Sequence, residues 1–111
     1  MDHVSLLYCT TPDPQTAETI ASTLLDEALI ACANILPGST SLYLWKGQRE
    51  RTSEALLLIK TSAARVPEVK KRVLELHPYE TPCVLEFRAD GASDAFAAWV
   101  SDLTGPKPAQ P

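Results

Sequence analysis

The sequence lacks the features of several large protein classes. It has no basic-then-apolar leader and no apolar run approaching about 18 residues, so we expect neither secretion nor a membrane span. Basic residues are in deficit, and the net charge of −4 excludes a nucleic-acid or anionic-membrane partner bound through bulk electrostatics. A chain of 111 residues has no room for a second core. We therefore expect one cytoplasmic domain.

Cysteine and glycine are also scarce. The three cysteines (Cys9, Cys32 and Cys83) are an odd number, which cannot form a closed set of intrachain disulfides. The four glycines are too scattered for a phosphate-binding loop. No local motif pairs a nucleophile with a base. The odd cysteine count favours a reducing compartment, and the sequence offers neither a phosphate-binding loop nor a local catalytic motif.

Hydrophobic periodicity predicts strands and helices in alternation. Residues 3–10 predict a short buried strand, and Asp13 followed by Pro14 predicts the start of a helix. The apolar face of that helix carries Ala17, Ile20, Ala21, Leu24, Leu25 and Ala28. An apolar run over residues 30–36 then stops at Pro37-Gly38, which predicts a turn or a bulge. A long hairpin follows, with its reversal at residues 46–48, an exposed tip and a buried base.

The second half of the chain repeats the alternation. A helix is predicted between Pro67 and Pro78, with Val66, Val69, Val73 and Leu76 on its apolar face. Residues 83–88 alternate as a strand does. Ser93 is expected to cap a last helix whose inward residues are Phe96, Trp99, Val100 and Leu103. Residues 1–103 form the expected domain, and the proline-rich residues 104–111 a flexible tail.

The predicted order βαββαβ, with a further helix at its end, is that of the α+β ferredoxin-like split βαβ sandwich. In this fold the helices cover one face of an antiparallel sheet. Tyr43 and Trp45 alternate with Leu42 and Leu44, which places the two aromatic side chains on the opposite, uncovered face. A bare aromatic face on a small domain favours a partner surface. We therefore expect the chain to form a homo-oligomer.

The densest polar cluster spans residues 77–82, where His77, Tyr79 and Glu80 follow a helix between two prolines. An imidazole titrates near neutrality and also binds metals, so the cluster suits a binding or acid–base site. The alternative is structural, because an imidazolium interacts well with the last carbonyls of a helix. The spacing alone favours the structural interpretation.

Three further residues can be explained either by packing and solvation or by a functional role: Cys32, Lys60 and Trp45. A free cysteine in an apolar strand is commonly a small buried hydrophobe, and its alternative role is a soft ligand for copper(I) or zinc. Cys9 and Cys83 allow the same two interpretations. No Cys-x-x-Cys or His-x-His pair is present, so a metal site requires tertiary or intersubunit proximity. Lys60 is either solvated or paired with an anion, and Trp45 favours an interface or the core.

Five motifs occur at Cys9–Asp13, Ala31–Gly38, Ser41–Gly47, Leu58–Thr61 and His77–Pro82. In this order and spacing they resemble the CutA family of divalent-cation-tolerance proteins, and the resemblance covers residues 4–103. It implies a ferredoxin-like protomer in a cyclic homotrimer that is built by edge-to-edge strand pairing. It also implies an association with copper and other divalent ions, an architecture similar to trimeric PII signalling proteins, and no assigned reaction.

The resemblance further implies a pocket at the subunit junctions. Carried over residue by residue, the pocket contains Cys32, His77, Tyr79 and Glu80, with Trp45 and Lys60 nearby. A thiolate with an imidazole is a sensible copper pair, since copper heads the divalent affinity order and copper(I) prefers sulfur. The family pattern continues with a glutamate where this chain has Cys83, which adds a third soft candidate ligand.

Three functional hypotheses follow. The leading one is a non-enzymatic homotrimer that binds copper or another divalent metal in cation tolerance or homeostasis. The second is a PII-like signalling module whose clefts take a small anion or an unidentified protein partner, with Lys60 and residues 49–54 as the binding groups. The third, an enzyme with His77 and Glu80 as acid and base, has the least support.

Overall fold

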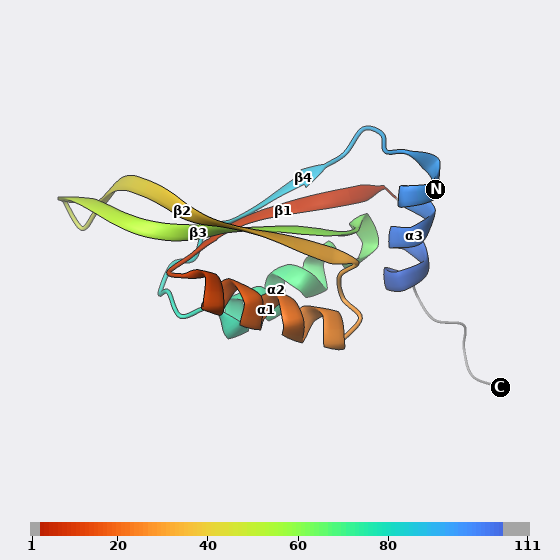
Figure 1. Ribbon diagram of the computed structural model, residues 1–111, viewed down its shortest axis with the longest axis horizontal. Coiled ribbons are helices and arrows are strands. Elements are labelled where there is room, and N and C mark those ends of the chain that lie inside the picture. The colour runs from red at the N-terminus through yellow and green to blue at the C-terminus, as the bar shows by residue number, and fades with distance from the viewer. Residues whose placement is uncertain (1–2, 106–111) are drawn as a thin grey trace.

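The structure, a computed structural model, describes residues 3–105 as a four-stranded sheet with helices packed on it (Figure 1). The elements are β1 (Val4–Thr11), α1 (Pro14–Asp26), β2 (Cys32–Trp45), β3 (Gln48–Ser62), α2 (Val66–Leu76), β4 (Val84–Arg88) and α3 (Asp94–Thr104). The strands are ordered β2-β3-β1-β4, and every pairing is antiparallel. This topology confirms the expected α+β ferredoxin-like sandwich.

Helix α1 begins as its sequence predicts and ends earlier. The Asp13 carboxylate accepts a hydrogen bond from the Thr16 backbone N–H at 2.7 Å, and Pro14 occupies the first turn. Two members of the predicted apolar face are not buried in the core. Leu25 is exposed, and Ala28 lies beyond the helix with a positive φ of 58°. The positive φ breaks the helical repeat, so the periodicity does not extend to Ala28.

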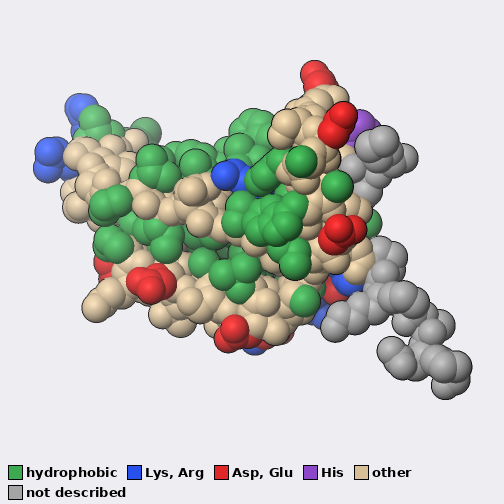
Figure 2. Space-filling model, turned by 45° about the vertical axis from the view of Figure 1, so that its right-hand side comes forward, with side chains coloured by type: hydrophobic (Ala, Val, Ile, Leu, Met, Phe, Trp, Pro, Cys, Tyr) green, Lys and Arg blue, Asp and Glu red, His purple; other side chains and the backbone are tan. Residues whose placement is uncertain are grey.

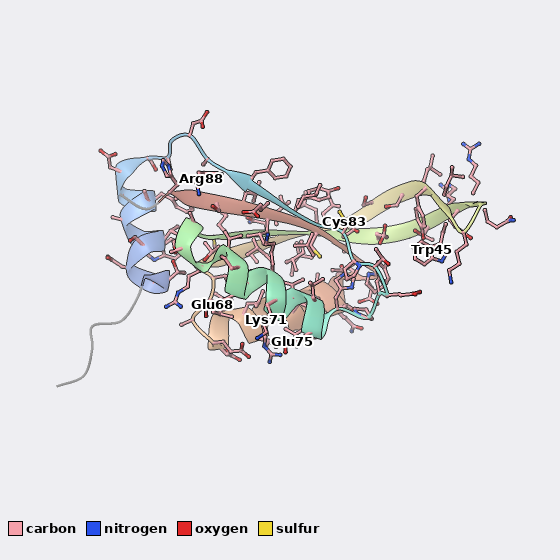
Figure 3. All side chains as sticks on the ribbon, turned by 180° about the vertical axis from the view of Figure 1, so that it is seen from behind. Trp45, Glu68, Lys71, Glu75, Cys83 and Arg88 are labelled. Carbon is pink, nitrogen blue, oxygen red and sulfur yellow. The ribbon has the colours of Figure 1, made fainter. Side chains whose placement is uncertain are left out.

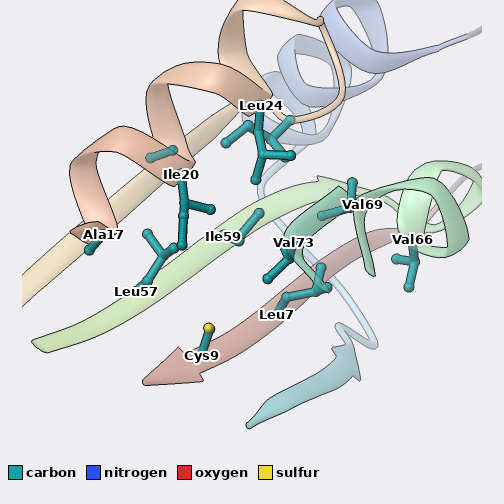
Figure 4. Close-up of a cluster of buried hydrophobic side chains, with 12 residues drawn as sticks. Leu7, Cys9, Ala17, Ile20, Leu24, Leu57, Ile59, Val66, Val69 and Val73 are labelled. Atoms are coloured by element: carbon teal, nitrogen blue, oxygen red, sulfur yellow. The ribbon is translucent and has the colours of Figure 1, made fainter. Parts of the chain in front are cut away.

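The hydrophobic core lies between the sheet and helices α1 and α2 (Figure 4). Strand β1 alternates strictly between buried and half-buried side chains, so Leu7 and Cys9 point towards the helices. The same sheet face carries Leu57 and Ile59 of β3. The helices contribute Ala17, Ile20, Ala21, Leu24, Val66, Val69 and Val73. Helices α1 and α2 thus bury one face of the sheet, and within residues 3–105 neither helix covers the opposite face.

Strands β2 and β3 form a hairpin that extends beyond the body of the molecule (Figure 1). Its pairing is interrupted between Leu36 and Ser39, so Pro37-Gly38 forms the bulge rather than the turn. The tip is a two-residue turn in which Lys46 and Gly47 both have positive φ, which matches the twist of the flanking strands. The base is buried and the tip exposed, as predicted.

The outer part of this hairpin is open on both sides. Tyr43 and Trp45 lie on an uncovered face, as expected, and are 42% and 40% exposed. In the structure Leu42 and Leu44 are 60% and 75% exposed, so both faces of the outer hairpin are uncovered. The reason is geometric, because the hairpin beyond the bulge has passed the end of the helix layer (Figure 1).

Helix α3 also differs from its prediction. Ser93 occupies the N-cap position, as expected, but its side chain makes no capping hydrogen bond. Trp99 and Leu103 were expected to point inward and are 45% and 46% exposed, whereas Val100 is buried. The helix packs against the end of the sheet, which provides a narrow contact surface.

The predicted tail begins one residue too early. Thr104 ends α3 and is buried, with its hydroxyl 2.9 Å from that of Ser62, while residues 106–111 of the tail lie outside the described residues. Across residues 3–105, the helices are too short or too polar to cross a membrane.

Candidate functional site

His77 fastens the loop that follows α2 to strand β1. Its side chain is 7% exposed, its Nε2 lies 2.8 Å from the Thr10 carbonyl oxygen, and its Nδ1 accepts from the Tyr79 backbone N–H at 3.1 Å. A ring with this pair of contacts carries its proton on Nε2. Since both ring nitrogens are engaged within the chain, His77 can bind a metal only by giving up one of these bonds.

Tyr79 connects His77 to the hairpin. Its ring packs on the His77 ring at a centroid distance of 4.7 Å, and its hydroxyl donates to Glu54 Oε2 at 2.7 Å. Burial and the hydrogen bond to Glu54 raise the pKa of Tyr79. Glu54 is only 7% exposed, and within residues 3–105 it forms no ion pair. His77, Tyr79 and Glu54 therefore form one connected corner around an uncompensated carboxylate.

Cys9 and Cys83 lie beside this corner. Cys9 is fully buried, and burial, followed by the nearby Cys83 and Glu54, raises the pKa of Cys9 to about 12. The Cys9 thiol is thus protonated at neutral pH, which suits a small hydrophobe. Cys83 is half-buried and directly precedes β4, so it is outside the strand that residues 83–88 predicted. All three cysteines are free thiols.

Cys32 lies apart from that corner within one chain. It opens the edge strand β2, opposite Lys60 on β3, whereas the carbonyl that His77 contacts belongs to Thr10, opposite Leu56. Those two register positions are four residues apart, or roughly 13 Å along a strand. Among residues 3–105 there is no group of three or more His, Cys, Asp or Glu side chains placed to hold a metal ion.

The remaining predicted residues are also dispersed. The Lys60 Nζ donates to Asn34 Oδ1 at 2.7 Å and lies 6.0 Å from the Phe96 ring centroid. Trp45 lies near the hairpin tip, far from Cys83 at the start of β4 (Figure 3). Glu80 is exposed. A single chain therefore brings together His77, Tyr79 and Glu54 and places Cys83 near Cys9. Cys32, Lys60 and Trp45 lie apart from that corner, and Glu80 is exposed.

The sheet face opposite the helices is apolar and open. Register places Leu6, Tyr8 and Leu58 on it beside Leu85 and Phe87 of β4, the last two being half exposed. Figure 2 shows hydrophobic side chains gathered over much of one side of the molecule. An apolar area of this kind is typical of a surface that binds another protein.

Sequence reasoning missed Glu54 as a member of the corner. The sequence carries one local signal for Glu54, because this residue directly precedes the apolar run that forms the buried part of β3. Its partner Tyr79 is 25 residues away, and only the fold brings the two together. Thr52, two residues earlier on the same strand face, was missed as well, and its buried hydroxyl has no hydrogen-bond partner among the described residues.

The sequence model of the family described as "CutA1 divalent ion tolerance protein" matches residues 5–103. The "Divalent-cation tolerance protein CutA" of Thermus thermophilus is 39% identical over 105 residues, which is 95% of this chain and 100% of that protein. Its namesake in Pyrococcus horikoshii is 36% identical over 99 residues, covering 89% of this chain and 96% of that one. The crystal structure of "divalent ion tolerance protein CutA1" from Ehrlichia chaffeensis has a TM-score of 0.91 at 37% identity, and the match covers 96% of this chain and 99% of that one.

Proposed function

Since the chain belongs to the CutA1 family of divalent ion tolerance proteins, we propose that it acts in tolerance of divalent cations by binding them. The observation that carries the proposal is the match of residues 5–103, essentially the whole folded domain, to that family. The relatives are named for cation tolerance and not for a reaction, so the proposed role is binding without catalysis.

The proposed working unit is a homotrimer in the cytoplasm. The apolar sheet face and the exposed Trp99 and Leu103 of α3 support an assembly, because burial of apolar surface stabilises an interface by about 25 cal/mol per Å². Strands β2 and β4 are the two edges of the sheet, and each offers backbone groups for pairing with another copy. A chain that exposes an apolar sheet face and two unpaired strand edges is stabilised when a second copy of the chain covers that face and pairs with one of those edges.

The proposed metal ligands are Cys32, Cys83 and His77. Two free, half-buried thiols suit a soft cation such as copper(I) better than a hard one. Cys32 opens one edge strand and Cys83 precedes the other, so a site that uses both thiols takes them from neighbouring copies. In one chain the three residues do not form a site, and the fit depends on assembly.

Calorimetric titration with copper(I) under anaerobic conditions, and separately with zinc, tests the proposal. The variants Cys32→Ser and Cys83→Ser are each expected to lower the affinity and the number of ions bound per trimer. His77→Gln separates a ligand from a structural residue, since glutamine can still donate to the Thr10 carbonyl. Lys71→Gln, an exposed change on α2, is the control. Unchanged affinity and stoichiometry in both cysteine variants would show that neither thiol is a metal ligand.

The second candidate is a PII-like module that binds a small anion at the subunit clefts, and the position of Lys60 favours it. The Lys60 ammonium is held by Asn34 on the open sheet face and is half-buried. A ligand screen by thermal shift distinguishes the two roles, because a ligand that binds only the native state raises the melting temperature. A shift with a nucleotide or metabolite that Lys60→Ala abolishes, and none with metal, would favour this candidate.

A further inference from the structure

Glu54 is a buried carboxylate with no cation beside it. Its side chain is 7% exposed, and within residues 3–105 it takes part in no ion pair. Its Oε2 accepts a hydrogen bond from the Tyr79 hydroxyl at 2.7 Å, whereas its Oε1 has no hydrogen-bond partner among these residues and is not fully buried. A carboxylate that loses most of its hydration without gaining a countercharge is costly to bury. Glu54 is therefore a strong acceptor for a cation that the corner itself does not supply.

A second polar atom on the same strand face also lacks a partner. Thr52 and Glu54 are two residues apart on β3, which places their side chains on one face of the strand. The Thr52 hydroxyl is buried and makes no hydrogen bond to any described residue. Buried polar atoms are nearly always paired. Two unmatched oxygen atoms on one face therefore indicate a hydrogen-bond donor from outside the described chain.

Two phenol rings lie beside this carboxylate. Tyr79 contacts Glu54 directly, and burial together with that contact raises the pKa of Tyr79. Smaller effects of Tyr43 and Asp13 on the same pKa place both residues near the Tyr79 hydroxyl. The two tyrosines are each more than a third exposed, so a small solute can reach their rings. The face of an aromatic ring attracts a cation, which adds to the attraction of the carboxylate.

We propose that Glu54, Tyr43 and Tyr79 form a binding site for a small organic ammonium ion. The free Oε1 of Glu54 accepts a hydrogen bond from the ammonium group, and the phenol rings contact the cationic head. The site uses a carboxylate and two rings, so it is separate from the proposed thiol ligands. The inference goes beyond the proposed function and does not depend on metal binding.

The available ligand atoms favour an organic cation over a metal ion at this site. A bound divalent ion commonly takes several protein ligands, whereas Glu54 offers one free carboxylate oxygen. Within residues 3–105, no three side chains of His, Cys, Asp or Glu are grouped to hold a metal. An ammonium group needs only one carboxylate, because it donates up to three hydrogen bonds and is also attracted by the ring faces.

An NMR titration of the reduced, metal-free protein with n-butylammonium chloride tests the site. The amine salt replaces sodium chloride at constant ionic strength, because a chain with a net charge of −4 attracts any cation weakly. We expect saturable shifts of the backbone amide signals of Glu54 and Tyr79. The neutral analogue 1-butanol has a similar shape and is expected to cause no such shifts.

Three variants separate the contributions of charge and ring. Glu54→Gln removes the charge but can still accept the Tyr79 hydroxyl, and we expect it to lower the affinity at least about tenfold. Tyr43→Leu is expected to lower the affinity about twofold to fivefold, because only the attraction between ring and cation is lost. Glu18→Gln removes the same charge at an exposed position of α1 and is the matched control.

Three results would overturn the inference. The first is the absence of saturable shifts at Glu54 and Tyr79, or equal shifts with 1-butanol. The second is equal affinity of Glu54→Gln and Glu18→Gln for the amine. The third is a wild-type chain that does not bind the amine while Glu54→Gln weakens its assembly, since a neighbouring copy would then supply the cation. The proposed metal role stands or falls separately, with the cysteine variants.

Discussion

Replacement of His77 by alanine tests whether the histidine is a structural fastener. The ring is 7% exposed and engages the Thr10 carbonyl at 2.8 Å and the Tyr79 N–H at 3.1 Å. These two bonds join the loop after α2 to strand β1, and the Tyr79 ring packs on the imidazole. His77→Ala removes both bonds and the ring, so the loop loses its attachment to the sheet.

The structure sets the size of the effect. Each hydrogen bond contributes about 0.5–1.5 kcal/mol, and a buried group left without a partner costs about 1–3 kcal/mol. Tyr79 is more than a third exposed, so water can replace part of its lost bond, whereas Thr10 is less exposed. Together with the lost packing of a buried ring, we expect a loss of about 2–4 kcal/mol in the free energy of unfolding.

Urea denaturation at a fixed protein concentration measures the loss, because an oligomer's stability depends on concentration. His3→Ala is the matched control, since His3 is exposed and its backbone carbonyl, not its ring, accepts a hydrogen bond from Ala63. We expect the control to change stability by less than about 0.5 kcal/mol. If His77→Ala is no less stable than His3→Ala, the assignment of His77 as a fastener is wrong. His77→Gln is expected to recover part of the loss.

Three further predictions concern the core, the thiols and the surface. Leu24→Ala, at a fully buried position of α1, is expected to cost about 2–5 kcal/mol in urea denaturation, while Leu74→Ala on the exposed side of α2 stays close to wild type. Cys9 is expected to stay unmodified by iodoacetamide at pH 8, because its burial and its pKa of about 12 suppress the thiolate. Mass spectrometry locates the label, and fast labelling of Cys9 would contradict its burial. The hydrogen bonds from Arg72 lower the pKa of Glu27 in the folded protein. The Arg72–Glu27 pair therefore stabilises the fold at pH values above the unfolded-state pKa of the Glu27 carboxyl. This stabilisation is lost as the pH falls through the lowered pKa of the folded state. Carboxyl NMR titration of Arg72→Gln should show the pKa of Glu27 higher than in wild type, and an unchanged value would refute the pairing.

Elements with strong local signals were predictable from the sequence. The Asp13-Pro14 start, the buried face of α1 and the Lys46-Gly47 reversal each depend on residues close together in the chain. The helix-end interpretation of His77 expected its imidazolium to meet the last carbonyls of α2, whereas its ring contacts the Thr10 carbonyl of β1 and the Tyr79 N–H, and only its backbone N–H bonds to Val73 of the helix.

Features that depend on distant contacts were not predictable. The exposed Trp99 and Leu103 have the same helical periodicity as buried residues, and only the position of α3 at the end of the sheet separates the two cases. The contact between Glu54 and Tyr79 joins two elements with no shared sequence signal. The separation of Cys32 from His77 likewise follows from strand register, which a motif does not specify.

Native mass spectrometry with and without copper(I) shows whether the chain is a trimer that binds copper through its thiols. We expect a species of three times the 12.1 kDa chain mass that binds copper, and a Cys32→Ser/Cys83→Ser variant that remains a trimer but no longer binds it. A monomer, or a trimer whose copper load is the same with and without the two thiols, would contradict this expectation.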